Sequence, residues 1–127
     1  MRVVIVLICG DRNWSDASLI RRVVAELPAG TVVLAGAARG ADALAASAAK
    51  ALGYEVREFP ADWKRFGNGA GVLRNRAMLD AHPDRVIAFH DDLQRSRGTR
   101  DCVEEAQRRE IAVTVIRHGG VECQEAR

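Results

Sequence analysis

Four segments of the chain combine glycine with polar side chains of the kind that bind phosphate and sugar hydroxyls. They span residues 10–15, 36–42, 67–76 and 96–99. Glycine lets a backbone turn sharply and approach a ligand closely, and free N–H groups at the start of a following helix attract anions. Each segment leads from an apolar run towards a stretch with helical periodicity. The pattern therefore predicts ligand-binding loops between strands and helices.

Arginines and short polar residues in these loops are the candidate contacts. Arg12 offers a planar guanidinium that suits phosphate or carboxylate. Arg74 lies close to the start of a predicted helix, where the macrodipole disfavours a cation unless an anion is shared. The candidate ligand-binding residues are Gly10, Asp11, Arg12, Gly36, Arg39, Gly40, Asp42, Arg74, Asn75, Ser96, Gly98 and Thr99.

Several polar and aromatic residues also have purely structural interpretations. Asp42 and Thr99 each stand where the N-cap of a helix is expected. Trp63 suits either a core position over the edge of the sheet or a stacking platform for a ligand, and the core position is favoured. Arg76 lies two positions after Arg74 and points elsewhere, so we expect it at the surface or in a salt bridge.

Other kinds of site and partner receive little support. The three histidines and three cysteines are scattered, without the spacing of a metal site or a disulfide framework, so neither a metal nor a cofactor is predicted. A net charge of +2 and an aromatic content of 5% argue against a nucleic-acid partner. No run approaches ~20 apolar residues, so no membrane partner is predicted and the chain is expected in the cytoplasm.

The spacing of apolar residues predicts alternating strands and helices. Strands are expected at 3–9, 31–35, 54–59, 86–89 and 111–116, and helices at 16–27, 42–52, 72–81 and 99–109. Ser15 or Asp16 can cap the first helix. The strand at 54–59 has a mixed pattern and is expected near an edge of the sheet.

This alternation predicts an α/β fold, a three-layer sandwich in which helices cover both faces of a five-stranded, mainly parallel sheet. One domain is expected over residues 1–117, followed by a flexible C-terminal tail at 118–127. Ligands of such sheets bind beyond the carboxyl ends of the strands, where the strand order reverses. The four loops are therefore expected to meet at one edge.

Taken together, the loops resemble those of the YspA or cpYpsA-related SLOG family. The resemblance rests on Gly-Ala-Ala-Arg-Gly-Ala-Asp at 36–42, Pro-Ala-Asp-Trp at 60–63, Ala-Gly-x-x-Arg-Asn-x-x-Met at 70–78 and Ser-Arg-Gly-Thr at 96–99. It runs from about residue 3 to residue 116 and implies a Rossmann-like fold. It also implies a nucleotide or nucleotide-derived ligand. Some members are linked to bacterial or phage conflict systems.

The wider superfamily includes LOG-type phosphoribohydrolases, and the chain departs from their motif. Those enzymes carry Pro-Gly-Gly-x-Gly-Thr-x-x-Glu, whose glutamate is needed for cleavage. Here Gly98 and Thr99 are present, but the glutamate position falls on Cys102. Asp101 is one residue away, which rotates it by roughly 100° on a helix. Cleavage of an N-glycosidic bond needs a carboxylate, and the candidate catalytic residues are Asp42, Asp62 and Asp101.

The sequence leaves two functions open. The first is binding or sensing of a nucleotide or nucleotide-derived ligand, favoured because the loops are retained and the glutamate is not. The alternative is a hydrolase that cleaves the N-glycosidic bond of a nucleoside monophosphate or related nucleotide. A DNA-associated role like that of DprA, another superfamily member, is disfavoured by the small size and modest charge. Related hydrolases form dimers, so the resemblance also implies a homodimer.

Overall fold

The apolar runs of the sequence form the strands of one sheet. A computed structural model describes residues 2–124, with the backbone alone for residues 120–124. The first five strands are β1 (Ile5–Gly10), β2 (Val32–Gly36), β3 (Glu55–Phe59), β4 (Arg85–Phe89) and β5 (Ala112–Arg117). They are mutually parallel and lie in the order β3-β2-β1-β4-β5. The predicted α/β fold is confirmed, including the edge position of β3.

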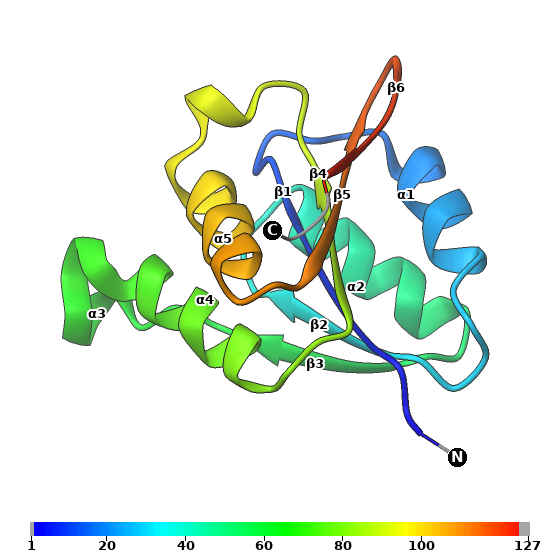
Figure 1. The fold of residues 1–127 in the computed structure, drawn as a ribbon, viewed down its shortest axis with the longest axis horizontal. Helices are drawn as coiled ribbons and strands as arrows, with labels where there is room; N and C mark the ends of the chain where they lie inside the picture. Colours follow the sequence, from blue (N-terminus) through cyan, green and yellow to red (C-terminus); the bar gives the residue numbers. More distant parts are fainter. Residues whose placement is uncertain (1, 125–127) are drawn as a thin grey trace.

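Four helices cover the two faces of this sheet (Figure 1). They are α1 (Ala17–Ala25), α2 (Ala41–Ala51), α4 (Ala70–Asp80) and α5 (Arg97–Arg108). Asp16 caps α1, because its side chain accepts the N–H of Leu19 at 3.1 Å. The predicted strands and helices all appear, with ends within two residues of those expected.

Alternation along the strands divides the core into two layers. Val6 and Ile8 of β1 point towards α1 and α2, whereas Leu7 points towards α4 and α5. Helix residues such as Ile20 and Met78 meet these two sets from opposite sides. Both faces of β1 are therefore buried, which explains why its sequence is continuously apolar rather than alternating.

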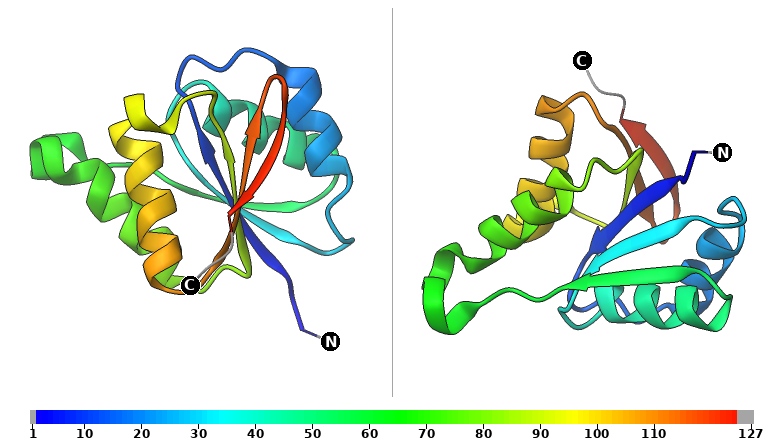
Figure 2. Two further views of the ribbon diagram at one scale, coloured as in Figure 1. Left: turned by 45° about the horizontal axis from the view of Figure 1, so that its top comes forward. Right: turned by 90° about the horizontal axis from the view of Figure 1, so that it is seen from below.

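The connection from β3 to α4 contains two short helices, although neither a strand nor a helix was expected between residues 59 and 72. These are α3 (Trp63–Phe66) and the 3-10 turn η1 (Gly67–Gly69). The side chain of Asp62 caps α3 by accepting the N–H of Arg65 at 3.1 Å. Figure 2 shows α3 projecting past the end of the sheet, beside the start of α4. A second 3-10 turn, η2 (Leu93–Arg95), lies between β4 and α5.

The C-terminal segment corrects the prediction of a flexible tail over 118–127. Gly120–Gln124 forms a sixth strand, β6, which pairs antiparallel with β5. A two-residue loop at His118 and Gly119 reverses the chain, a loop length typical of tight hairpins. Pairing satisfies the N–H and C=O groups that β5 would otherwise expose at the edge. Residues 125–127 lie outside the described part.

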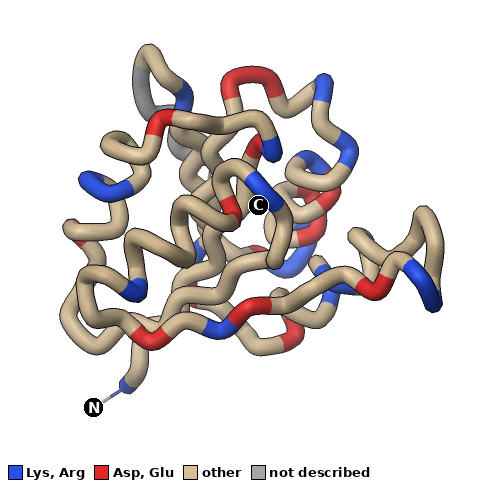
Figure 3. The backbone as a smooth tube through the Cα atoms, turned by 180° about the vertical axis from the view of Figure 1, so that it is seen from behind, with Lys and Arg blue, Asp and Glu red and all other residues tan. Residues whose placement is uncertain are grey.

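The opposite edge strand, β3, carries charged side chains. Glu55, Arg57 and Glu58 alternate in sign along it, and Figure 3 shows red and blue segments following one another along this edge of the backbone. Arg57 and Glu55 form an ion pair at 2.8 Å. Charged side chains on an exposed edge disfavour pairing with another sheet.

Among the described residues, no helix is long and apolar enough to cross a membrane.

Candidate functional site

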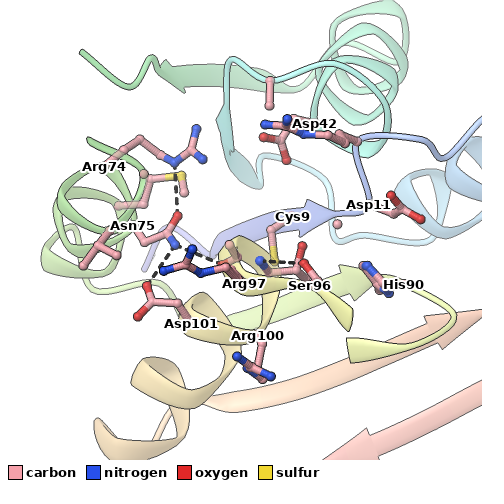
Figure 4. Close-up of a pocket in the computed structure, with 18 of the residues that line it drawn as sticks. Cys9, Asp11, Asp42, Arg74, Asn75, His90, Ser96, Arg97, Arg100 and Asp101 are labelled. Atoms are coloured by element: carbon pink, nitrogen blue, oxygen red, sulfur yellow. Dashed lines mark hydrogen bonds between the residues drawn. The ribbon is translucent and has the colours of Figure 1, made fainter. Parts of the chain in front are cut away.

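A cleft of about 690 Å³ opens at the carboxyl edge of the sheet, where the strand order reverses. β1 lies between β2 and β4; the loop after β1 leads to α1 on one face, and the loop after β4 leads to α5 on the other. The two loops diverge, and such a divergence leaves a crevice. Figure 4 shows Asp42, Asn75 and Ser96, which come from different elements, around this cleft.

Most of the predicted contacts line this cleft, and some do not. Gly36, Arg39, Gly40 and Asp62 lie outside it. The predicted residues that line it are Gly10, Asp11, Arg12, Asp42, Arg74, Asn75, Ser96, Gly98, Thr99 and Asp101. Three of the four predicted loops thus contribute several residues, whereas the 36–42 loop contributes Ala38 and Asp42.

Gly10 and Gly40 allow the first two loops to interlock. A Cβ atom at Gly10 would lie 2.7 Å from the Cβ of Ala41 and would also meet the carbonyl oxygen of Phe89. Gly40 has a φ of +76°, and a Cβ there would meet the carbonyl oxygens of Asp11 and Arg12. The N–H of Ala41 donates to the carbonyl of Asp11 at 3.0 Å. The glycines are needed for this contact between loops.

Asp42 and Arg74 face each other across Gly36. A Cβ atom at Gly36 would meet the guanidinium of Arg74 and would lie 2.6 Å from Oδ2 of Asp42. Asp42 is not the N-cap predicted for α2, because Gly40 occupies that position and Asp42 lies within the first turn. Its side chain is buried at 6% exposure. Burial raises the pKa of Asp42 from 3.8 to about 7, opposed by the charge of Arg74 and the N–H of Ala38.

Arg74 does not sit at the helix start that the sequence suggested. α4 begins at Ala70, two residues before the predicted start, so Arg74 falls in the second turn. Its Nε donates to Asn75 Oδ1 at 3.1 Å, and its Nη1 donates to the carbonyl of Phe59 at 3.5 Å. These contacts, together with Asp42, hold the guanidinium at the wall of the cleft.

Asn75 joins α4 to the first turn of α5. Its amide nitrogen donates to the carbonyl of Gly98 at 3.2 Å and to Asp101 Oδ2 at 3.1 Å. Arg76 also reaches Asp101, at 3.3 Å, and Glu105, at 3.7 Å. The prediction of a salt bridge for Arg76 is confirmed. Both N–H groups of the Asn75 amide are engaged within the protein, so this residue fixes the start of α5.

The start of α5 presents unsatisfied donors. Ser96 is the N-cap, and its hydroxyl accepts the N–H of Thr99 at 3.1 Å; the prediction that Thr99 caps this helix was wrong. The N–H groups of Arg97 and Gly98 precede any carbonyl that could accept them within the helix. Thr99 is 6% exposed and lines the cleft, and its hydroxyl forms no hydrogen bond with a described residue.

Arginines surround this helix start. Arg12, Arg95 and Arg97 line the cleft, are exposed, and form no ion pair within the described part of the chain. Arg100 lines it as well, and its Nη1 donates to the carbonyl of Gln94 at 3.0 Å. The positive end of the helix dipole and these side chains give this end of the cleft a positive potential.

The sequence is similar to those of known proteins. The model of the YspA, cpYpsA-related SLOG family matches residues 4–66. The Gene 61 protein of Mycobacterium phage D29 is 42% identical over 117 residues, which cover 85% of this chain and 92% of that protein.

The chain belongs to the YspA, cpYpsA-related SLOG family.

A solved structure extends the likeness to the fold. DNA processing protein A (DprA) from Streptococcus pneumoniae superposes with a TM-score of 0.75 at 20% identity. The superposition covers 89% of this SLOG chain and 50% of the DprA chain, so the chain spans half the length of that protein. The Rossmann-like fold expected from the resemblance is thereby confirmed.

The three candidate catalytic carboxylates of this SLOG chain lie in different surroundings. Asp42 is buried and faces the cleft. Asp101 also faces the cleft but is held by Asn75 and Arg76. Asp62 lies outside the cleft, where it caps α3. Cys102, at the glutamate position of the hydrolase motif, is 1% exposed and does not line the cleft.

Cys102 instead meets Cys9 in the core beneath the cleft. A hydrogen bond with Cys102, burial and the charge of Asp42 raise the pKa of the Cys9 thiol. Both cysteines are free. In the described part of the SLOG domain, no three side chains of histidine, cysteine, aspartate or glutamate gather in the way a metal site requires.

Other residues also line the cleft, among them His90, which the sequence did not single out, and Trp63, for which a core position was favoured over a stacking platform. His90 follows β4 directly and is 8% exposed, and its Nδ1 accepts the N–H of Asp92 at 2.9 Å. A neutral His90 therefore carries its proton on Nε2. Trp63 was placed in the core, but it is 54% exposed because α3 projects from the sheet. The sequence signal for His90 was its position directly after a predicted strand, and the signal for Trp63 was its place in the Pro-Ala-Asp-Trp motif.

Proposed function

We propose that the cleft binds a nucleotide or nucleotide-derived ligand, with its phosphate at the start of α5. The observation that carries this proposal is the open hydroxyl of Thr99 beside the free N–H groups of Arg97 and Gly98. Phosphate oxygens accept from such donors, and the helix dipole favours their charge. Arg12, Arg95 and Arg97 add cations that form no ion pair with a described carboxylate, although Asp11 and Glu104 also line the cleft.

The opposite wall suits a sugar. Asp42 lines the cleft with a carboxyl group that exchanges its proton near pH 7, so it either donates to or accepts from a hydroxyl. Arg74 lies beside it, and its positive charge favours the ionised carboxylate against the effect of burial. A ribose between Asp42 and the start of α5 would place its phosphate on the donors of that helix.

The test is binding of a panel of nucleoside monophosphates, dinucleotides and cyclic nucleotides, measured by thermal shift and calorimetry. At least one compound is expected to raise the melting temperature, because a ligand present at 100 times its Kd adds about 2.7 kcal/mol to the free energy of unfolding. A panel in which no phosphate-bearing compound shifts the melting temperature would refute the proposal.

Two variants locate the phosphate. Thr99→Val keeps the shape of the side chain but removes its hydroxyl, and Arg97→Gln removes one cation. Each is expected to weaken binding of a nucleoside monophosphate about tenfold while leaving binding of the corresponding nucleoside unchanged, because a hydrogen bond to a charged group contributes about 1.5 kcal/mol. Arg21→Gln is the matched control, since Arg21 is an exposed arginine of α1 outside the cleft. Equal weakening by Arg21→Gln would show that general charge, rather than this site, sets the affinity.

A second function, hydrolysis of the N-glycosidic bond of a nucleoside monophosphate, is favoured by one observation. Asp42 holds its proton up to about pH 7 at the wall of the cleft. A general acid needs such a pKa to protonate the departing base, while water adds to C1′ and ribose 5-phosphate is released. Incubation with nucleoside monophosphates should then yield free base, and Asp42→Asn should abolish the release. Release that persists in Asp42→Asn would remove Asp42 from this role.

A further inference from the structure

The arm formed by α3 and the start of α4 exposes large apolar side chains. Trp63, Phe66, Val72 and Leu73 are exposed at 54%, 45%, 41% and 48%, respectively. Within the described part of the chain, α3 has its main contacts with η1 and α4, and it projects past the sheet in Figure 2. Tryptophan is the largest apolar side chain and is usually well covered in a folded protein. Its exposure here marks this part of the surface for a contact.

Two of these four side chains belong to the cleft. Trp63 and Val72 line it, together with Asn68 and Gly71, whereas Phe66 and Leu73 do not. A Cβ atom at Gly71 would lie 3.4 Å from Cη2 of Trp63, so the ring edge rests beside a residue without a side chain. The indole is thus supported by the first turn of α4 while much of its surface stays open.

The cleft therefore has an aromatic wall in addition to its cationic one. The cationic wall comes from the loops after β1 and β4 and from the start of α5, and the aromatic wall comes from α3 and the start of α4. A nucleotide has two parts that complement these walls: an anionic phosphate for the cationic wall and a flat aromatic base for the aromatic wall. Bases stack on aromatic side chains with free energies of about 1–3 kcal/mol, whichever base is present.

We propose that Trp63 is the platform on which the base of the ligand stacks, with Val72 beside it. This inference rests on the proposed function, because it assigns the second end of the same ligand. It makes Trp63 a residue that distinguishes a nucleotide from a sugar phosphate. The motif Pro-Ala-Asp-Trp thereby acquires a role in binding, and Asp62 acts by capping the short helix that carries the indole.

Calorimetry on the full chain tests the proposal with two kinds of probe: the four common ribonucleoside 5′-monophosphates and ribose 5-phosphate. In the unmodified protein, at least one monophosphate should bind tighter than ribose 5-phosphate by about tenfold or more. Trp63→Ala should abolish most of that difference and leave ribose 5-phosphate unchanged. Trp63→Phe should retain part of it. Phe66→Ala is the matched control, an exposed aromatic of the same helix outside the cleft, and should bind as the unmodified protein does.

Fluorescence gives an independent readout. The chain has two tryptophans, and Trp14 is 4% exposed and stacked on His118 with ring centroids 4.0 Å apart. A stacked base should therefore quench the emission of Trp63 specifically. Saturating monophosphate should lower the emission of the unmodified protein and leave that of Trp63→Phe unchanged. Quenching of equal size in Trp63→Phe would place the base elsewhere.

The outcomes separate this inference from the function on which it rests. If a monophosphate binds the unmodified protein and Trp63→Ala equally well, the platform is refuted while nucleotide binding stands. If Trp63→Ala weakens ribose 5-phosphate as much as the monophosphates, Trp63 supports the fold of the site and the platform is again refuted. If neither kind of probe binds the unmodified protein, the proposed function itself fails.

Discussion

Replacing Asp42 with asparagine should stabilise the protein in a way that depends on pH. Asp42 is 6% exposed, and burial raises its pKa from 3.8 to about 7 in the folded protein. The unfolded chain loses this proton near the lower value, so the folded state holds more protons between the two. The free energy of unfolding must therefore fall as pH rises through this interval.

The size of the effect follows from the same two values. The interval from 3.8 to about 7 spans about 3 pH units, and each unit corresponds to about 1.4 kcal/mol. The charged carboxylate thus costs the native state ~4 kcal/mol above pH 7 and nothing below about pH 4. Asparagine has nearly the same shape and carries no charge, so Asp42→Asn should recover most of this cost at high pH.

Urea denaturation of both proteins between pH 4 and pH 9 measures the difference. The two midpoints should coincide near pH 4, separate steadily up to about pH 7, and remain parallel above it. Val33→Ala, a cavity-forming change in the core, supplies the control for a difference that does not vary with pH. The reasoning is refuted if Asp42→Asn is the less stable protein at pH 8, or if its difference from the unmodified protein is the same at every pH.

Three further predictions concern the framework of the site. Asn75→Ala should lower the free energy of unfolding by about 1–3 kcal/mol in urea, because it removes one donor from the Gly98 carbonyl and one from Asp101; an unchanged midpoint would contradict this role. Gly10→Ala should cost at least about 2 kcal/mol, whereas Gly98→Ala should leave stability unchanged, because a Cβ at Gly98 would meet nothing within 4 Å. His118 lowers the pKa of Asp91 through its backbone N–H and its ring. The side chain of Asp91 should therefore titrate at higher pH in His118→Ala when followed by NMR, and an unaltered titration would exclude the ring contact.

The order of strands and helices was readable from local pattern. The apolar run of β1 could only be a strand buried on both faces, and Asp16 stood where the first helix needed a cap. These features depend on neighbours within a few residues. The tail was misjudged because β6 is stabilised by pairing with β5, and a short segment after a tight turn carries little signal of its own.

The glycine-rich loops were also correctly placed at one edge of the sheet. The sequence did not show which of their residues contact another loop and which line the cleft. Gly10 and Gly40 are needed because the loops after β1 and β2 pack closely against each other, and this contact is visible only in the tertiary structure. Asn75 looked like a ligand contact, yet its amide is engaged by Gly98 and Asp101, more than 20 residues away in the chain. Spacing in the sequence does not report such partners.

Local patterns of residues predicted the set of elements, their alternation, and the edge of the sheet at which polar loops gather. The burial, exposure and hydrogen-bond partners of each side chain there depend on tertiary packing. Asp42 acquires its raised pKa from burial, and Trp63 stays exposed because α3 projects beyond the layers that cover the sheet. Burial and exposure depend on the packing of distant segments, whereas strand and helix patterns are set by the periodicity of nearby residues.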